Sequence, residues 1–132
     1  MTVNLIRSDR LYKGVPYAYA SVAPPGSLVF TAGACPLDDK GEVVGAGDVR
    51  AQASLAVANL STTLAESGAT LADVLKTTIF VASTEQADLV AAWEVISMAF
   101  GDHDPPSTLL GVTVLGYSGQ LVEIEAVAVV AG

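Results

Sequence analysis

The chain has 132 residues, of which 52% are hydrophobic and only 15% are charged. Soluble domains of ordinary composition carry about 25% charged residues, and a small domain has a large surface for its volume. Because so few charges are available for that surface, we expect part of it to be covered by further copies of the chain. The net charge of −8 and the scattered positions of the six Lys and Arg residues argue against binding of nucleic acid through its phosphates.

The sequence carries no sign of export or of membrane insertion. The longest charge-free stretches, residues 14–37 and 105–122, are interrupted by proline and glycine, so neither predicts a membrane helix. The first ten residues lack an apolar core of signal-peptide length. The one cysteine, Cys35, cannot form an internal disulfide, which is typical of a reducing compartment. We therefore expect a cytoplasmic protein with one domain over residues 1–132.

The first third of the chain predicts strands. Residues 3–8 are a candidate short strand. Residues 17–23 and 27–34 are two strand-like runs, and the Pro-Pro-Gly sequence at 24–26 between them predicts a hairpin. The Asp-Asp-Lys-Gly sequence at 38–41 predicts a second turn.

The middle of the chain predicts a helix, a strand and a second helix. Apolar residues recur at helical spacing between Asp48, a candidate N-cap, and Gly68, a C-terminal stop signal. Residues 74–82 are rich in Thr, Ile, Phe and Val and predict a strand. The segment that opens at Ser83 has the spacing of a capping box, with glutamine three residues later, and predicts a helix to about Phe100. The apolar stripe of this second helix consists of Leu89, Trp93, Ile96 and Phe100.

The chain closes with a loop and two more predicted strands. The loop covers residues 101–106, and the strands, residues 108–115 and 120–130, flank a turn at 116–119. The predicted order is β-β-β-α-β-α-β-β, which is an α/β fold. Two helices of this length cover one face of a sheet, so something else must cover the other face, most economically a partner chain.

Alternation along the last strand separates an apolar face from a face that carries two carboxylates. The face suited to the helices consists of Val122, Ile124, Ala126 and Ala128, and the other of Leu121, Glu123, Glu125 and Val127. A carboxylate on a covered face is costly unless it is paired or used for function. The alternation alone leaves open whether these glutamates have a function or are simply solvated on a half-exposed strand.

The remaining reactive side chains predict little chemistry. One histidine and one cysteine far apart give no metal-ligand spacing, so we expect no metal site. His103 lies in a polar loop and is expected at the surface, and Cys35 is expected to be a buried, inert thiol. The Gly-Ala-Gly sequence at 45–47 lacks the third glycine of a dinucleotide loop. Spacing does not decide between pocket lining and simple packing for Tyr12, Tyr17, Tyr19 and Tyr117.

Several stretches together resemble the RidA/YjgF family, the reactive-intermediate (enamine/imine) deaminases. They span nearly the whole chain from Gly14 onward, in the family's order: Gly-Val-Pro-Tyr at 14–17, Val-Phe-Thr-Ala-Gly at 29–33, Gly41, Gln52 through Leu60, Ser-Gly-Ala at 67–69, Asp-Val-Leu-Lys-Thr-Thr-Ile-Phe-Val at 73–81, and Val-Glu-Ile-Glu-Ala-Val-Ala at 122–128.

The resemblance implies a chorismate-mutase-like fold, with a mixed sheet and two helices on one face, in a homotrimer. The sheets of such a trimer face inward, and its clefts lie between adjacent subunits. The family's typical reaction hydrolyses 2-aminoacrylate-type enamines and imines to a 2-keto acid and ammonia, without a metal or an organic cofactor. An arginine holds the substrate carboxylate, a glutamate handles water and a tyrosine lines the cleft.

These roles carry over to only some of the positions here. Glu123 matches the glutamate, Tyr17 the cleft tyrosine and Gly33 the glycine of a strand-end motif. The family's Pro-Ala-Arg-Ser reads Pro-Pro-Ser-Thr at 105–108, so Ser107 stands where the arginine should be. Further departures are Leu109 at a cysteine position, Tyr19 and Ala34 at positions that are often glutamine, and one extra residue within 116–120.

Loss of the arginine changes the expected substrate. A guanidinium binds a carboxylate through two charge-assisted hydrogen bonds of about 1.5–3 kcal/mol each, whereas a serine offers one neutral bond of about 1 kcal/mol. The sequence names no replacement cation in the cleft, although Arg10 or Lys13 of a neighbouring chain has the required charge.

We therefore expect a small-molecule hydrolase or deaminase that acts on an uncharged enamine, imine or related compound, not a typical 2-aminoacrylate deaminase. Tyr17, Ser107 and Thr108 would orient the ligand, and Glu123 would act as general base toward water. The alternative is a non-catalytic trimer that binds a small ligand or has a regulatory role. The acidic composition argues against a ribonuclease.

Overall fold

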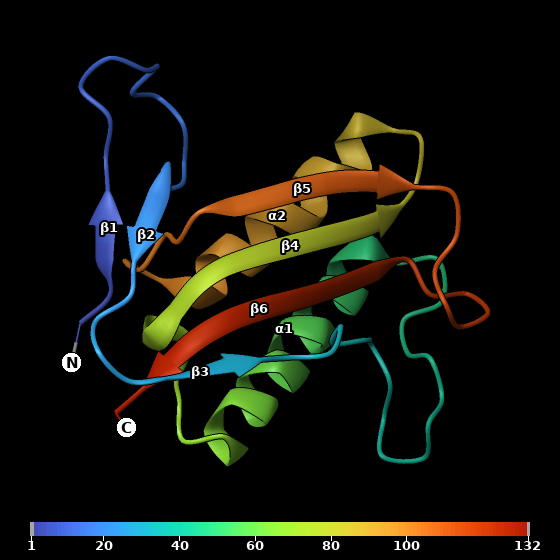
Figure 1. Cartoon of the computed structure of the whole chain (residues 1–132). Helices are drawn as coiled ribbons and strands as arrows, with labels where there is room; N and C mark the ends of the chain where they lie inside the picture. The colour runs from blue at the N-terminus through green and yellow to red at the C-terminus, as the bar shows by residue number, and fades with distance from the viewer. Residues whose placement is uncertain (1, 132) are drawn as a thin grey trace.

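The computed structural model describes residues 2–131 (Figure 1). The order of helices and strands is the one expected from the sequence, with one short 3-10 helix, η1, added. The elements are β1 (Asn4–Ile6), β2 (Ala20–Val22), β3 (Ser27–Phe30), α1 (Val49–Glu66), η1 (Leu71–Asp73), β4 (Val74–Ala82), α2 (Gln86–Phe100), β5 (Ser107–Val112) and β6 (Val122–Val130).

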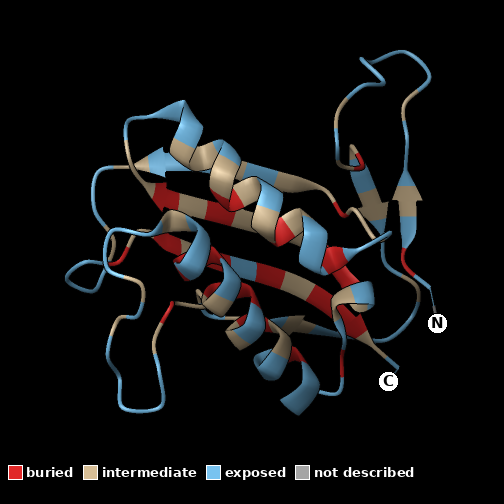
Figure 2. Ribbon diagram, turned by 180° about the vertical axis from the view of Figure 1, so that it is seen from behind, coloured by how far each residue is buried: buried red, intermediate tan, exposed pale blue. Residues whose placement is uncertain are grey.

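Four strands form a mixed sheet in the order β3-β6-β4-β5. β6 is antiparallel to β3 and to β4, whereas β4 and β5 are parallel, because α2 carries the chain back across the sheet between them. Both helices lie on the same face of this sheet (Figures 1 and 2). The expectation of a mixed sheet with two helices on one face is therefore confirmed.

The core lies between the helices and the sheet, where Figure 2 shows the buried residues gathered. Val122, Ile124, Ala126 and Ala128 are buried there, as the alternation predicted. Glu123 and Glu125 lie on the opposite face, which we call the open face, half-buried and exposed respectively. Leu121 was wrongly assigned to that face: β6 begins one residue later, and Leu121 packs against the helix-side core.

The ends of α1 follow the predicted signals, but the start of α2 does not. Asp48 accepts a hydrogen bond from Ala51 N at 3.0 Å, and Gly68 has the positive φ (85°) that follows many helices. The capping box predicted at Ser83 is absent, because the helix begins two residues further on. Ser83 Oγ instead accepts from Glu85 N and donates to the Asp88 carboxylate. Neither helix of the described chain is long and apolar enough to span a bilayer.

The hairpin predicted around residues 24–26 is also wrong. β2 pairs with β1 in a separate two-stranded arm, whereas β3 pairs with β6 in the main sheet (Figure 1). Two adjacent prolines supply no N–H donors for a hairpin ladder, so the segment serves as a crossing from the arm to the sheet. The last two strands are likewise not neighbours, because β4 lies between β5 and β6.

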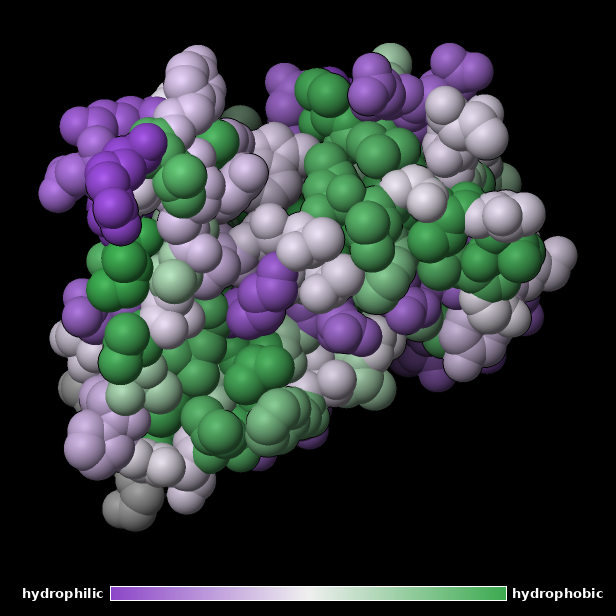
Figure 3. Space-filling view, turned by 45° about the horizontal axis from the view of Figure 1, so that its top comes forward, coloured by the Kyte–Doolittle hydropathy of each residue, from purple (hydrophilic) through white to green (hydrophobic). Residues whose placement is uncertain are grey.

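The arm covers only one end of the open face. Val3, Leu75 and Val129 form a small buried cluster there, and Ser21 Oγ donates to Leu75 O at 2.6 Å. Elsewhere large apolar side chains remain exposed, among them Phe30 at 72% and Leu28 at 52%. Figure 3 shows apolar side chains gathered in patches on this side of the molecule, with hydrophilic ones between them. The uncovered face expected from the sequence is therefore present.

The loop that leads into β6 is fastened to α1 by one buried side chain. Gln52 has no exposed surface. Its Nε2 donates to Gly119 O at 3.0 Å and to Gly45 O at 3.2 Å, and its Oε1 accepts from Leu121 N at 2.7 Å. These bonds fix the backbone just before the strand that carries Glu123.

We predict that Gln52→Leu lowers the free energy of unfolding by about 2–4 kcal/mol. It leaves Gly45 O, Gly119 O and Leu121 N without their partner, and each group that stays shielded from water costs roughly 1–3 kcal/mol. Urea unfolding followed by circular dichroism, at one protein concentration, measures the change. Gln86→Leu, at an exposed position on α2, is the matched control and should stay within about 0.5 kcal/mol of the parent. Equal stability of the two variants would contradict this role of Gln52.

Candidate functional site

The sequence-predicted site residues fall into two groups on opposite faces of the sheet. Ser107 pairs with the buried Thr77 and faces the helices, close to Tyr17. Glu123 pairs with Phe80 on the open face and lies against Gly33. The structure thus brings Tyr17 together with Ser107, and Gly33 with Glu123, but it does not bring the two groups together within one chain.

The group on the open face is a carboxylate half-site made of Gly33, Cys35, Gln120 and Glu123. Gln120 Nε2 donates to Glu123 Oε1 at 3.1 Å, and Cys35 Sγ approaches the same oxygen at 3.4 Å. The other oxygen, Oε2, lies so close to Gly33 that a Cβ at this position would collide with it. Glycine at position 33 therefore makes room for the carboxylate.

Cys35 is half-buried rather than buried, and its thiol is a hydrogen-bond donor. Burial first, then the hydrogen bond to Glu123 and the negative charge of that carboxylate, together raise its pKa to about 11. The thiol is therefore protonated at neutral pH and is a poor nucleophile. Sequence reasoning missed the contact of Cys35 and Gln120 with Glu123, because nothing in the local pattern indicates which side chains a β-strand carboxylate meets.

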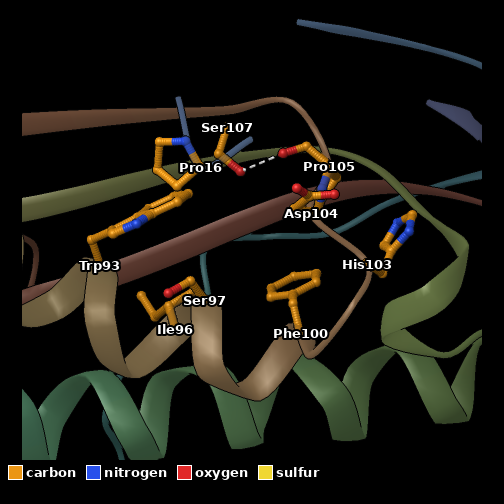
Figure 4. Close-up of a pocket in the computed structure, with 9 residues that line it drawn as sticks. All are labelled: Pro16, Trp93, Ile96, Ser97, Phe100, His103, Asp104, Pro105 and Ser107. Carbon is orange, nitrogen blue, oxygen red and sulfur yellow. Dashed lines mark hydrogen bonds between the residues drawn. The ribbon is translucent and has the colours of Figure 1, made fainter. Parts of the chain in front are cut away.

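The group on the helix face is an apolar half-site made of Pro16, Tyr17, Trp93, Ser107 and Leu109. These residues line a groove of about 430 Å³ beside β5, together with Val90 and Thr108. The rings of Tyr17 and Trp93 meet edge to face, with centroids 6.3 Å apart. A narrower pocket continues from Ser107 and Trp93 along α2 toward Phe100 and His103 (Figure 4).

The hydroxyl group of Ser107 already has partners within the chain. It donates to Pro105 O at 3.0 Å, as Figure 4 shows, and it accepts from Thr77 Oγ1 at 2.6 Å. Its proton is therefore engaged, and it offers no free donor for a ligand carboxylate in this arrangement. Thr108, the next residue, alternates to the open face, where its Oγ1 accepts from Lys76 Nζ at 2.5 Å.

Two cations lie near Tyr17 without replacing an arginine at position 107. Arg7 and Lys13 line a cavity of about 200 Å³ with Tyr17 and Tyr19. Arg7 is engaged by Asp104 through both guanidinium nitrogens, and these hydrogen bonds hold the pKa of Asp104 below its ordinary value. Lys13 thus lines the same cavity as Tyr17 of its own chain.

Two other candidates have structural contacts. His103 is half-buried, and its Nε2 lies 2.8 Å from Val74 O, so it reaches the surface but also contacts the backbone of β4. Tyr19 lies directly before β2, at the loop end of the arm, and its hydroxyl donates to Tyr12 O at 2.6 Å. In the described part of the chain no three His, Cys, Asp or Glu side chains come close enough together to hold a metal ion.

Comparison with known proteins places this geometry in one family. The sequence model described as "Endoribonuclease L-PSP" matches residues 9–130. The protein DfrA of Myxococcus xanthus is 35% identical over 98% of this chain and 97% of its own length. A 2-iminobutanoate/2-iminopropanoate deaminase of Salmonella typhimurium is 33% identical over 79% of this chain and 80% of its own length.

A solved structure extends the likeness to three dimensions. The Rid family protein YyfB of Yersinia pestis superposes with a TM-score of 0.89, at 30% identity, over 98% of this chain and all of that one. The match therefore includes the arm, the mixed sheet and both helices. On these comparisons the chain belongs to the RidA/YjgF family, as its sequence motifs suggested.

Proposed function

We propose that this protein hydrolyses a small, uncharged imine or enamine at clefts between the subunits of a homotrimer. The observation that carries the proposal is the carboxylate half-site, in which Glu123 is held by Gln120 and Cys35 with its second oxygen turned toward Gly33. A carboxylate fixed in this way on a half-buried strand suits a general base that acts on water.

The two half-sites argue for a cleft shared between copies. A ligand in the apolar half-site of one chain lies on the other side of the sheet from the Glu123 carboxylate of the same chain. The open face next to Glu123 carries exposed Leu28, Phe30 and Leu110, which favours its burial against another copy. We infer that Glu123 of one copy faces Tyr17, Ser107 and Thr108 of the next.

The substrate is inferred from the charge that the cleft lacks. Position 107 offers a serine whose proton is engaged by Pro105 O, and Lys76 is directed to Thr108. The groove is otherwise lined by Pro16, Tyr17, Trp93 and other apolar side chains. A ligand carboxylate would be desolvated there without a paired cation, which is costly. A neutral imine, enamine or related compound meets no such penalty.

The reaction starts from the C=N bond, which an enamine forms by tautomerisation, and Glu123 transfers two protons in turn. Glu123 removes a proton from water as the water oxygen bonds to the carbon of the C=N group. The π electrons of the C=N bond move to nitrogen. The carboxylic acid then returns the proton to the nitrogen of the tetrahedral intermediate. Glu123 next moves the hydroxyl proton of this intermediate to its nitrogen. The C–N bond then breaks as the C=O bond forms, and a carbonyl compound and ammonia leave. This sequence requires no redox partner and balances with one water consumed.

The names of relatives support the reaction class but not the substrate. The Salmonella relative is named for two imino acids, which carry carboxylates; the hydrolysis of a C=N bond is what we carry over. The family description names an endoribonuclease. A chain with a net charge of −8 and six Lys and Arg residues in all is poorly suited to bind a polyanion.

A second function fits the same cleft. The groove beside β5 is mostly apolar, and the hydroxyl of Ser107 is already engaged within the chain. Such a groove also suits a trimer that binds a neutral ligand without converting it. The presence or absence of turnover distinguishes the two functions.

We predict that the protein accelerates ammonia release from the freshly generated neutral enamine 2-aminoacrylamide, or from a related neutral imine, and not from 2-aminoacrylate, which differs by one negative charge. Glu123→Gln should lower the turnover of the neutral compound at least a hundredfold, since general-base catalysis contributes about 10²–10⁴-fold. Ammonia is measured by a coupled assay against the uncatalysed rate.

Glu125→Gln is the control for this assay, because Glu125 lies two residues away on the same face and is exposed. It should retain most of the turnover. Faster ammonia release from 2-aminoacrylate would contradict the conclusion that the substrate is uncharged, which was drawn from Ser107 in place of an arginine. If no neutral imine or enamine turns over but such compounds raise the melting temperature, the binding function replaces the hydrolase.

Cys35 serves in this proposal as a donor to Glu123 and not as a nucleophile. Its pKa of about 11 reflects burial first and the Glu123 carboxylate second. We predict that Glu123→Gln shifts the pH midpoint of Cys35 alkylation by iodoacetamide from about 11 toward lower pH. The thiol then loses a negative neighbour but stays buried, so the midpoint remains above that of a free cysteine. An unchanged midpoint would show that the two side chains do not interact.

A further inference from the structure

We propose that Gln120 is a positioning residue for Glu123: its buried amide holds the carboxylate in the one orientation that directs Oε2 past Gly33 into the cleft. This inference rests on the general-base role proposed above. It concerns a residue that lies in the loop before β6 and not in the strand motif that carries Glu123.

Every polar atom of the Gln120 side chain is used. The residue is only 3% exposed. Its Nε2 donates to Val122 O and to Glu123 Oε1, both at 3.1 Å, and its Oε1 accepts from Tyr117 N at 3.2 Å. A buried amide satisfied by two backbone groups cannot turn without breaking those bonds. The N–H that points at Glu123 is therefore held in place by the backbone.

The loop that carries Gln120 is itself held from α1. Gln52 bonds to Gly119 O on one side of Gln120 and to Leu121 N on the other. The second donor is held from the same helix, because Asn59 Nδ2 of α1 donates to the carbonyl of Cys35 at 2.8 Å. Both donors to Glu123 are thus anchored to the same helix through buried or half-buried amides.

These contacts give the two carboxylate oxygens of Glu123 different surroundings. Oε1 receives both donors, Gln120 Nε2 and Cys35 Sγ. Oε2 lies against Gly33, where the missing Cβ leaves the carboxylate uncovered. A base held at one oxygen and free at the other meets water in a constant geometry, and a displacement of about 1 Å in such a site costs on the order of a hundredfold in rate.

The test replaces Gln120 by methionine, which has a similar length but no N–H donor. A crystal structure of Gln120→Met should show the Glu123 side chain displaced from Gly33 or spread over more than one rotamer. With the neutral substrate, kcat should fall about tenfold to a hundredfold, and KM should change less than threefold, because Gln120 touches no part of the apolar half-site.

Two controls separate positioning from general damage. Gln86→Met introduces the same change at an exposed position on α2. Leu64→Val, in the core at the far end of α1, lowers stability without touching the carboxylate half-site. Both should retain the kcat of the parent, and Glu123 should keep its position in each.

The proposal is overturned if Glu123 keeps its single position in Gln120→Met, or if kcat is unchanged despite a displaced carboxylate. It is also overturned if Leu64→Val and Gln120→Met lose the same amount of melting temperature and Leu64→Val lowers kcat as much as Gln120→Met does. Should the parent turn over no neutral substrate, the proposed hydrolase fails, while the structure of Gln120→Met still decides whether Gln120 holds the carboxylate.

Discussion

A sheet covered by helices on one face only is the constraint on which the rest of this structure depends. The chain has two helices, and both pack on the same side of the four-stranded sheet. The open face therefore keeps exposed Leu28 and Phe30 beside the half-buried Glu123. An apolar face of this kind favours burial against other copies. The proposed trimer would explain the sparse charge of the sequence in the same way, because a surface shared between copies needs fewer charged residues.

The position of the chemistry follows from that constraint. Alternation along β6 sends Val122 and Ile124 into the core and Glu123 to the open face, whereas β5 directs Ser107 toward the helices. One chain therefore holds a carboxylate half-site and an apolar half-site that cannot serve one ligand together. In the proposed trimer, each cleft combines the carboxylate of one copy with the groove of the next. A substrate bound there meets a fixed base but no cation at position 107, which is why we infer a neutral compound.

How well a feature could be predicted from the sequence depends on how far apart in the chain its interacting residues lie. Several local signals were confirmed: Asp48 caps α1, and residues 74–82 form β4 with the expected bounds. The local capping box predicted at Ser83 was not. Pairing was less predictable, because the prolines at 24–26 resemble a hairpin turn and yet separate two sheets. The contacts of Cys35 and Gln120 with Glu123 had no sequence signal. Cys35 and Glu123 lie 88 residues apart in the chain. Gln120 is only three residues from Glu123, but their contact depends on the loop conformation that Gln52 of α1 holds.

The most direct test is a crystal structure of the assembled protein, with its copy number checked in solution by light scattering. We expect three copies whose open faces are turned inward. The Glu123 carboxylate of one copy should then face Ser107 and Tyr17 of its neighbour across the span of one small ligand. A monomer, or an assembly that leaves Glu123 and the groove beside β5 on unconnected surfaces, would contradict the shared cleft and the reaction inferred from it.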